Sequence, residues 1–71
     1  METVTIESDS IQLDQFLKWV GIAQTGGHAK MLIAEGLIEV NGETEHKRSK
    51  KLVPGDQVYI KDGGTFKIVK E

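Results

Sequence analysis

Residues 13–42 read LDQFLKWVGIAQTGGHAKMLIAEGLIEVNG, and within this stretch the spacing of the apolar side chains changes from that of a helix to that of a strand. In its first part the apolar residues stand at the i, i+3, i+4 and i+7 positions of a helix with one buried stripe, namely Leu13, Phe16, Leu17 and Val20. Gly21 is placed to end this helix, because glycine readily adopts the left-handed backbone found there. The pattern predicts a helix over residues 13–20.

A second helix is expected between Thr25 and Gly36. Thr25 can cap its first amides, and Gly36 stands where a left-handed terminating residue is needed. The apolar face of this helix consists of Ala29, Leu32 and Ile33. The two helices are therefore joined by a tight connection over residues 21–24.

Beyond Gly36 the period becomes two, because Ile38 and Val40 alternate with a glutamate, and Asn41-Gly42 is the strongest short signal for a hairpin turn. Further strands are predicted at Thr3–Ile6, Gln57–Lys61 and Thr65–Val69, separated by turn sequences at Val53–Asp56 and Asp62–Gly64. The polar run Ser8–Ser10 offers caps for the first helix. The fold class is therefore α+β: a strand, two short helices and three or four antiparallel strands, in a single domain over residues 1–71.

Composition narrows the classes of protein. Of the 71 residues, 38% are hydrophobic and 28% charged, with one proline, which is typical of a globular chain. The absence of cysteine excludes disulfide scaffolds, thiol catalysis and cysteine-based zinc sites. No apolar run approaches the ~18 residues of a membrane span, and the first residues do not resemble a signal peptide. We therefore expect a soluble protein of a reducing cytoplasm, without a membrane partner.

The net charge of −2 hides an uneven distribution. Residues 1–24 and residues 25–46 are each acidic, whereas four of the nine basic residues lie in the pentapeptide Lys47-Arg48-Ser49-Lys50-Lys51. This segment is either a solvated loop that keeps the protein soluble or a phosphate-binding patch, and composition alone weighs the two interpretations equally. Four phosphate contacts would give a log–log salt slope of roughly −3.

The start of the second helix is another candidate anion site. Free amides at a helix N-terminus accept anions, and the glycines of Thr25-Gly26-Gly27 would let a phosphate approach the backbone closely. The alternative is simply a flexible helix start. Lys18 and Lys30 are expected on the exposed sides of the two helices. Trp19 is either partly buried or a stacking surface for a base, and partial burial is favoured.

Features for catalysis or metal binding are sparse. His28 and His46 lie eighteen positions apart and belong to no metal-binding motif. Acid–base work by neighbouring carboxylates, the pairs being Asp9 with Asp14 and Glu43 with Glu45, would need a pocket that a domain of this size hardly provides. We therefore expect no enzyme activity, no metal and no cofactor.

The order of residues resembles that of the S-four RNA-binding domain, named for the fourth protein of the small ribosomal subunit. The pieces that carry the resemblance lie within about residues 11–61 and are Leu13–Lys18, Gly21–Ala23, Ala29–Ile33, Gly36, Val40–Gly42, the basic run and Pro54–Asp56. In length the chain looks like the free-standing bacterial members of that family. The resemblance implies a compact fold in which two helices and a following loop pack on a small antiparallel sheet and present a basic face to structured RNA, commonly ribosomal RNA.

The family's arginines are replaced at two positions, by Gln12 and Gly26, which shifts the expected contacts toward the glycine amides and the basic run. We predict that a monomer binds structured RNA, ribosomal RNA or a ribosomal particle, during ribosome assembly or maturation. The predicted RNA-binding residues are Lys18, Thr25, Gly26, Gly27, Lys30, Lys47, Arg48, Lys50 and Lys51. The alternatives are a protein-interaction module with an incidental basic loop, and a duplex-DNA binder whose second helix offers only Lys30 as a strong basic contact.

Overall fold

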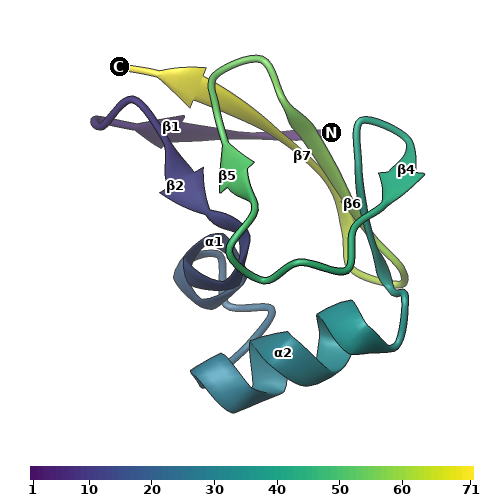
Figure 1. Cartoon of the computed structure of the whole chain (residues 1–71). Coiled ribbons are helices and arrows are strands. Elements are labelled where there is room, and N and C mark those ends of the chain that lie inside the picture. The colour runs from purple at the N-terminus through teal and green to yellow at the C-terminus, as the bar shows by residue number, and fades with distance from the viewer.

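A computed structural model describes all 71 residues (Figure 1). Along the chain, two strands are followed by two helices and five further strands. The elements are β1 (Glu2–Ile6), β2 (Ile11–Gln12), α1 (Leu13–Trp19), α2 (Gly26–Ala34), β3 (Ile38–Val40), β4 (Glu43–Thr44), β5 (Lys51–Leu52), β6 (Gln57–Ile60) and β7 (Gly64–Lys70). Both predicted helices and the strands predicted at 3–6, 57–61 and 65–69 are present with small shifts at their ends. The short strands β2 and β5, which pair with each other, were not predicted.

The main sheet has five strands in the order β1-β7-β6-β3-β4. The four strands of this sheet that follow the helices, β3, β4, β6 and β7, pair antiparallel, as predicted, but the sheet as a whole is mixed because β1 lies parallel to β7. The parallel pairing of β1 follows from the topology of the chain. A crossover through both helices separates β1 from β3 and returns the chain to the same end of the sheet, so these two strands share a direction. Since β3 and β7 both oppose β6, β1 meets β7 in parallel.

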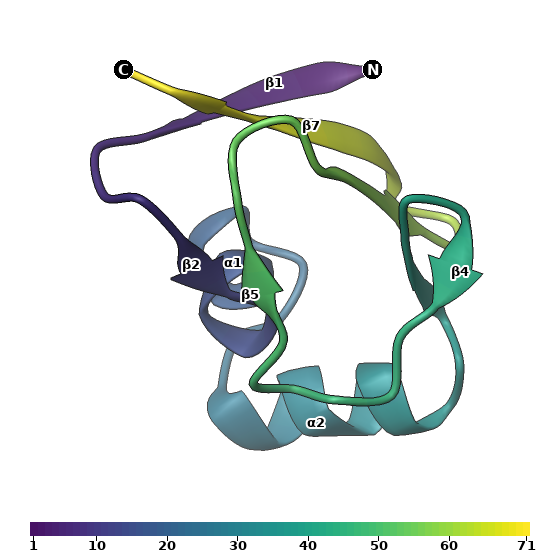
Figure 2. The same cartoon turned by 45° about the horizontal axis from the view of Figure 1, so that its top comes forward.

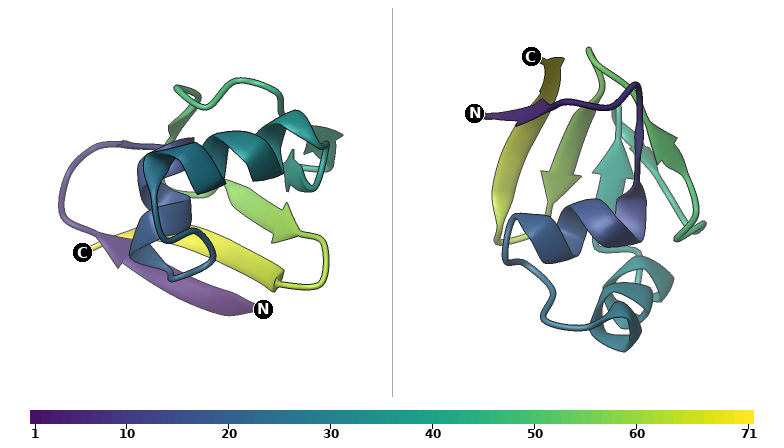
Figure 3. Two further views of the ribbon diagram at one scale, coloured as in Figure 1. Left: turned by 90° about the horizontal axis from the view of Figure 1, so that it is seen from below. Right: turned by 90° about the vertical axis from the view of Figure 1, so that its left-hand side faces the viewer.

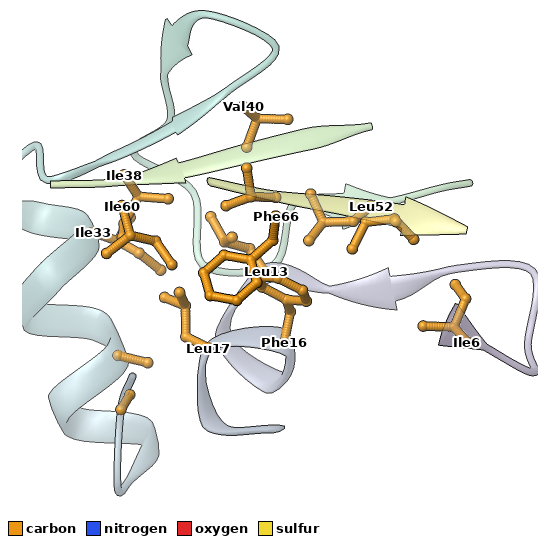
Figure 4. Close-up of a cluster of buried hydrophobic side chains, with 14 residues drawn as sticks. Ile6, Leu13, Phe16, Leu17, Ile33, Ile38, Val40, Leu52, Ile60 and Phe66 are labelled. Atoms are coloured by element: carbon orange, nitrogen blue, oxygen red, sulfur yellow. The ribbon is translucent and has the colours of Figure 1, made fainter. Parts of the chain in front are cut away.

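The helices lie together on one face of this sheet, as Figure 3 shows, and the core fills the space between the two layers. Fourteen hydrophobic residues are buried there, and no polar or charged residue is. Phe16 of α1 meets Phe66 of β7 edge to face, with ring centroids 5.7 Å apart and planes at 82° (Figure 4). Edge-to-face contact is a favoured aromatic geometry because it places the positive ring edge against the negative ring face.

The helices begin and end largely where the sequence indicates. Three of the four apolar residues of the predicted stripe, Leu13, Phe16 and Leu17, are fully buried, and burial of each stabilises the fold by about 1.5–3 kcal/mol. The fourth, Val20, follows the last residue of α1 and is half-buried against the core. Thr25 caps α2 through its Oγ1, which accepts a hydrogen bond from the His28 amide at 3.0 Å. The prediction for Ser8–Ser10 is wrong: these residues form a turn before β2, and no side chain caps α1.

The hairpin between β3 and β4 turns at Asn41 and Gly42, whose φ angles of 53° and 86° both lie in the left-handed region. The Asn41 side chain also crosses to the β5–β6 turn. Its Nδ2 donates to Asp56 Oδ1 at 3.1 Å, and its Oδ1 accepts from the Gln57 amide at 2.9 Å. Asp56 Oδ2 in turn accepts from the Val53 amide at 2.9 Å. We call the two hydrogen bonds that the Asn41 side chain makes, with Asp56 and with Gln57, the turn clamp.

Candidate nucleic-acid interface

The basic loop, residues 47–51, is fastened by its backbone to the start of α1. The Lys50 carbonyl accepts from the Leu13 amide at 2.8 Å, and the Arg48 carbonyl accepts from the Asp14 amide at 3.1 Å. The first amides of a helix have no partner within the helix, so the loop supplies acceptors that the missing side-chain cap would otherwise provide. Within the loop, the Lys50 amide donates to the Lys47 carbonyl at 3.2 Å.

Contacts on either side of this turn hold the loop further. Glu45 Oε2 accepts from the Lys47 amide at 3.1 Å, and Lys51 pairs with Gln12 in the small β2–β5 sheet. The course of the chain from β4 to β5 can be followed in Figure 2. The backbone is therefore fixed at several points, which reduces the ordering entropy that an anion would have to overcome on binding.

The side chains of the loop remain free to bind. All four of its basic residues, Lys47, Arg48, Lys50 and Lys51, are exposed. None of them pairs with a carboxylate, because the single salt bridge of the molecule joins Lys70 and Asp9. The loop therefore combines a fixed backbone with four unneutralised positive charges.

The start of α2 leaves two backbone amides without an acceptor. The amides of Gly26 and Gly27 are the first two of the helix, and no acceptor in the chain engages them. Thr25 Oγ1 already accepts from the third amide, so these two remain for a ligand. Lys30 is exposed and lies one helical turn from Gly26, on the same side of the helix.

Lys18 and Trp19 lie in the last turn of α1. Lys18 is exposed and stands four residues after Asp14, so it shares the helix face of the residue whose amide holds the loop. Trp19 is 56% exposed and lies outside the core. The predicted RNA-binding residues thus lie on three connected segments. Hydrogen bonds join the basic loop to α1, and α2 packs against α1.

The sequence identified the basic residues but not the backbone hydrogen bonds that attach their loop to α1. Main-chain carbonyls at positions 48 and 50 leave no signature in side-chain identity, so no motif indicated the contact with α1. The structure holds no group of three or more His, Asp or Glu side chains placed to bind a metal ion. Neither helix is long and apolar enough to cross a membrane.

Two short helices on a mixed sheet, with an exposed basic loop fixed to the first helix, define a small α+β module with a basic surface. The family model of the S4 domain matches residues 4–69, and the chain belongs to this family. The resemblance found in the sequence is thereby confirmed, as is the α+β fold class.

The chain is similar over nearly its full length to a Bacillus subtilis protein named "probable ribosome maturation protein RlbA", with 39% identity over 66 residues that cover 93% of each chain. The solution structure of YbcJ from Escherichia coli, described as revealing an ALFAL motif involved in RNA binding, matches with a TM-score of 0.70 and 31% identity over 97% of this chain and 87% of that one. Ribosomal protein S4e of Thermoplasma acidophilum shares the fold, with a TM-score of 0.62 and 20% identity over 86% of this chain and 32% of that one.

Proposed function

We propose that the whole chain acts as one non-enzymatic domain that binds structured RNA, ribosomal RNA in particular, as a monomer during ribosome maturation. The observation that carries the proposal is the basic loop, whose four free cations stand on a backbone bonded to the amides of Leu13 and Asp14. Two relatives support it: RlbA is named for ribosome maturation, and the YbcJ structure is described in terms of RNA binding. Membership of the S4 domain family also supports RNA binding.

The mechanism is electrostatic and depends on shape. Lys47, Arg48, Lys50 and Lys51 contact phosphates and release condensed counterions, while the free amides at the start of α2 take a further phosphate. Three of the four loop cations are lysines, which act on phosphates as point charges, so selectivity comes from the arrangement of phosphates in a folded RNA. Lys18 and Lys30 extend the positive surface along the two helices.

Charge reversal in the loop tests the proposal. The variant Lys50→Glu with Lys51→Glu is compared with Lys61→Glu plus Lys67→Glu, which makes the same change of net charge at exposed positions near the β6–β7 hairpin. Binding to a folded ribosomal RNA fragment is measured between 50 and 300 mM salt. The loop variant is expected to reduce the magnitude of the log–log salt slope by about 1.5, because it removes two phosphate contacts and each contributes about −0.7 to −0.9.

The hairpin variant should bind more nearly like the unchanged protein. Equal losses in both variants would show that only the total charge matters, and unchanged binding by a folded loop variant would remove the loop from the interface. Salt-insensitive binding to a protein, together with no preference for RNA, would instead support the protein-interaction alternative. Ultraviolet crosslinking in cells, followed by sequencing of the attached RNA, identifies which RNA is bound.

A further inference from the structure

A second surface, of opposite charge, lies beside Trp19 in the last turn of α1 and extends to Ile11, just before the helix begins. An open groove of about 560 Å³ forms where the end of β1, the start of β2 and the end of α1 meet the last residue of the chain. Its apolar lining comes from Ile6, Ile11 and the exposed Trp19, and its carboxylates belong to Glu7 and Glu71. None of these five residues belongs to the proposed RNA interface.

The parallel pairing of β1 with β7 creates this groove. Figures 1 and 2 show β7 ending beside the turn that follows β1. The Glu71 amide donates to the Ile6 carbonyl at 3.0 Å, which brings Glu71 to the same end of the sheet as Glu7 although 64 positions separate them in the chain. Two carboxylates thus line one groove through a contact between the ends of the sequence.

The negative charge of the groove is not neutralised within the molecule. Neither Glu7 nor Glu71 takes part in a salt bridge. Lys70 precedes Glu71 directly, but its ammonium group is held by Asp9. A phosphate-bearing ligand would be repelled here, whereas a cation would gain two favourable interactions.

The lining selects the kind of cation. A cation over the face of an indole is attracted by the ring quadrupole, and guanidinium also stacks on aromatic faces. Ile6 lines the groove but is only 2% exposed, so the half-buried Ile11 and the exposed Trp19 supply the apolar surface on which the methylene stem of an arginine can lie while its charged end meets a carboxylate. The exposed indole, the apolar surface and the free carboxylates together match an arginine side chain.

We propose that this groove binds an arginine-bearing basic segment of a protein partner. The proposal is independent of RNA binding, since the groove and the basic loop share no residue and carry opposite charge. The protein then has two docking surfaces, one for phosphates on the basic loop and one for a basic segment in the groove beside Trp19.

Trp19 is the only tryptophan of the chain, so tryptophan fluorescence reports on the surroundings of this one side chain in the groove. The probe is a capped five-residue peptide with two arginines separated by glycine, and the control peptide carries glutamine in place of both arginines. The arginine peptide is expected to change the fluorescence in a saturable way, with weaker binding at 500 mM than at 50 mM salt. The glutamine peptide should produce no saturable change.

A matched pair of charge variants locates the effect. Glu7→Gln with Glu71→Gln is expected to weaken binding of the arginine peptide about fivefold, the size expected for two exposed charge interactions. Glu35→Gln with Glu43→Gln removes the same charge at exposed positions outside the groove and should weaken binding less than twofold. Thermal unfolding of each variant checks that the fold is kept.

Three outcomes would overturn the proposal. The first is an equal response to the glutamine peptide, which requires no variant to interpret. The second is equal weakening in both pairs of variants. The third is a fluorescence change with a folded RNA but none with the arginine peptide, because Trp19 would then be part of a nucleic-acid surface. Loss of RNA binding in the loop variant bears on the proposed function and leaves this result untouched.

Discussion

Replacing Asn41 by alanine is expected to lower the free energy of unfolding by about 2 kcal/mol, although the side chain is exposed. The variant removes both hydrogen bonds of the turn clamp, to Asp56 Oδ1 and from the Gln57 amide. Because water replaces part of their energy, the two bonds together contribute about 1 kcal/mol. Alanine must also adopt the φ of 53° found at this position, which costs about another 1 kcal/mol.

Thermal unfolding followed by circular dichroism measures the effect. For a domain of this size, a loss of about 2 kcal/mol lowers the midpoint by roughly 8–16 °C. Asp56→Ala, alone and combined with Asn41→Ala, completes a double-mutant cycle, and the two changes should be less than additive because they break one shared bond. Ser49→Ala is the control, since Ser49 is exposed and its hydroxyl makes no hydrogen bond within the chain.

An Asn41→Ala midpoint within 2 °C of the unchanged protein would refute this reasoning, as would strictly additive effects in the cycle. The result also bears on the family motifs. Val40-Asn41-Gly42 and Pro54-Gly55-Asp56 are part of the resemblance to the S-four domain, and the clamp gives them a structural role: each turn holds the other. RNA affinity of the folded Asn41→Ala protein should therefore be unchanged.

Two further predictions concern single sites. Gly63→Ala should destabilise the fold by about 1–3 kcal/mol, because the new Cβ would lie 2.8 Å from Cγ2 of the stiff, branched Ile60. Urea unfolding measures the effect, and stability equal to that of the unchanged protein would mean that Ile60 moves aside freely. Thr25→Ala should lower the free energy of unfolding by about 1 kcal/mol, because it removes the hydroxyl that caps α2. Thr25→Ser keeps the hydroxyl, so its free energy of unfolding should lie within about 0.5 kcal/mol of that of the unchanged protein in the same assay. Equal losses in both variants would show that the methyl group matters instead.

The sequence was sufficient to predict those elements whose structure depends on residues close together in the chain. The stripe of Leu13, Phe16 and Leu17 predicts both the helix and its buried face, and Asn41-Gly42 predicts the turn because few residues tolerate two left-handed positions in succession. Each of these features depends on residues only a few positions apart. The helices and the antiparallel strands were therefore predictable.

Contacts between distant segments were not predictable in the same way. Ser8–Ser10 had the side chains of a helix cap, but the carbonyls of Arg48 and Lys50, more than thirty positions away, occupy the first amides of α1 instead. The parallel pairing of β1 with β7 was not predicted for the same reason, because it joins segments at the two ends of the chain. For the candidate site, composition located the basic residues, whereas their attachment to α1 and the groove around Trp19 depend on tertiary contacts.

The net charge of −2 therefore says little about which partners the protein attracts, because α1 separates two surfaces of opposite sign. A helix of seven residues spans roughly 10 Å, which is about one Debye length at physiological ionic strength. At that salt concentration the carboxylates beside Trp19 only weakly offset the field of the basic loop. At 10 mM salt the Debye length grows to about 30 Å, and the two surfaces act on each other. Neutralising Glu7 and Glu71 should therefore raise RNA affinity at low salt and leave it nearly unchanged at 150 mM, as a titration with a folded RNA at the two salt concentrations would show.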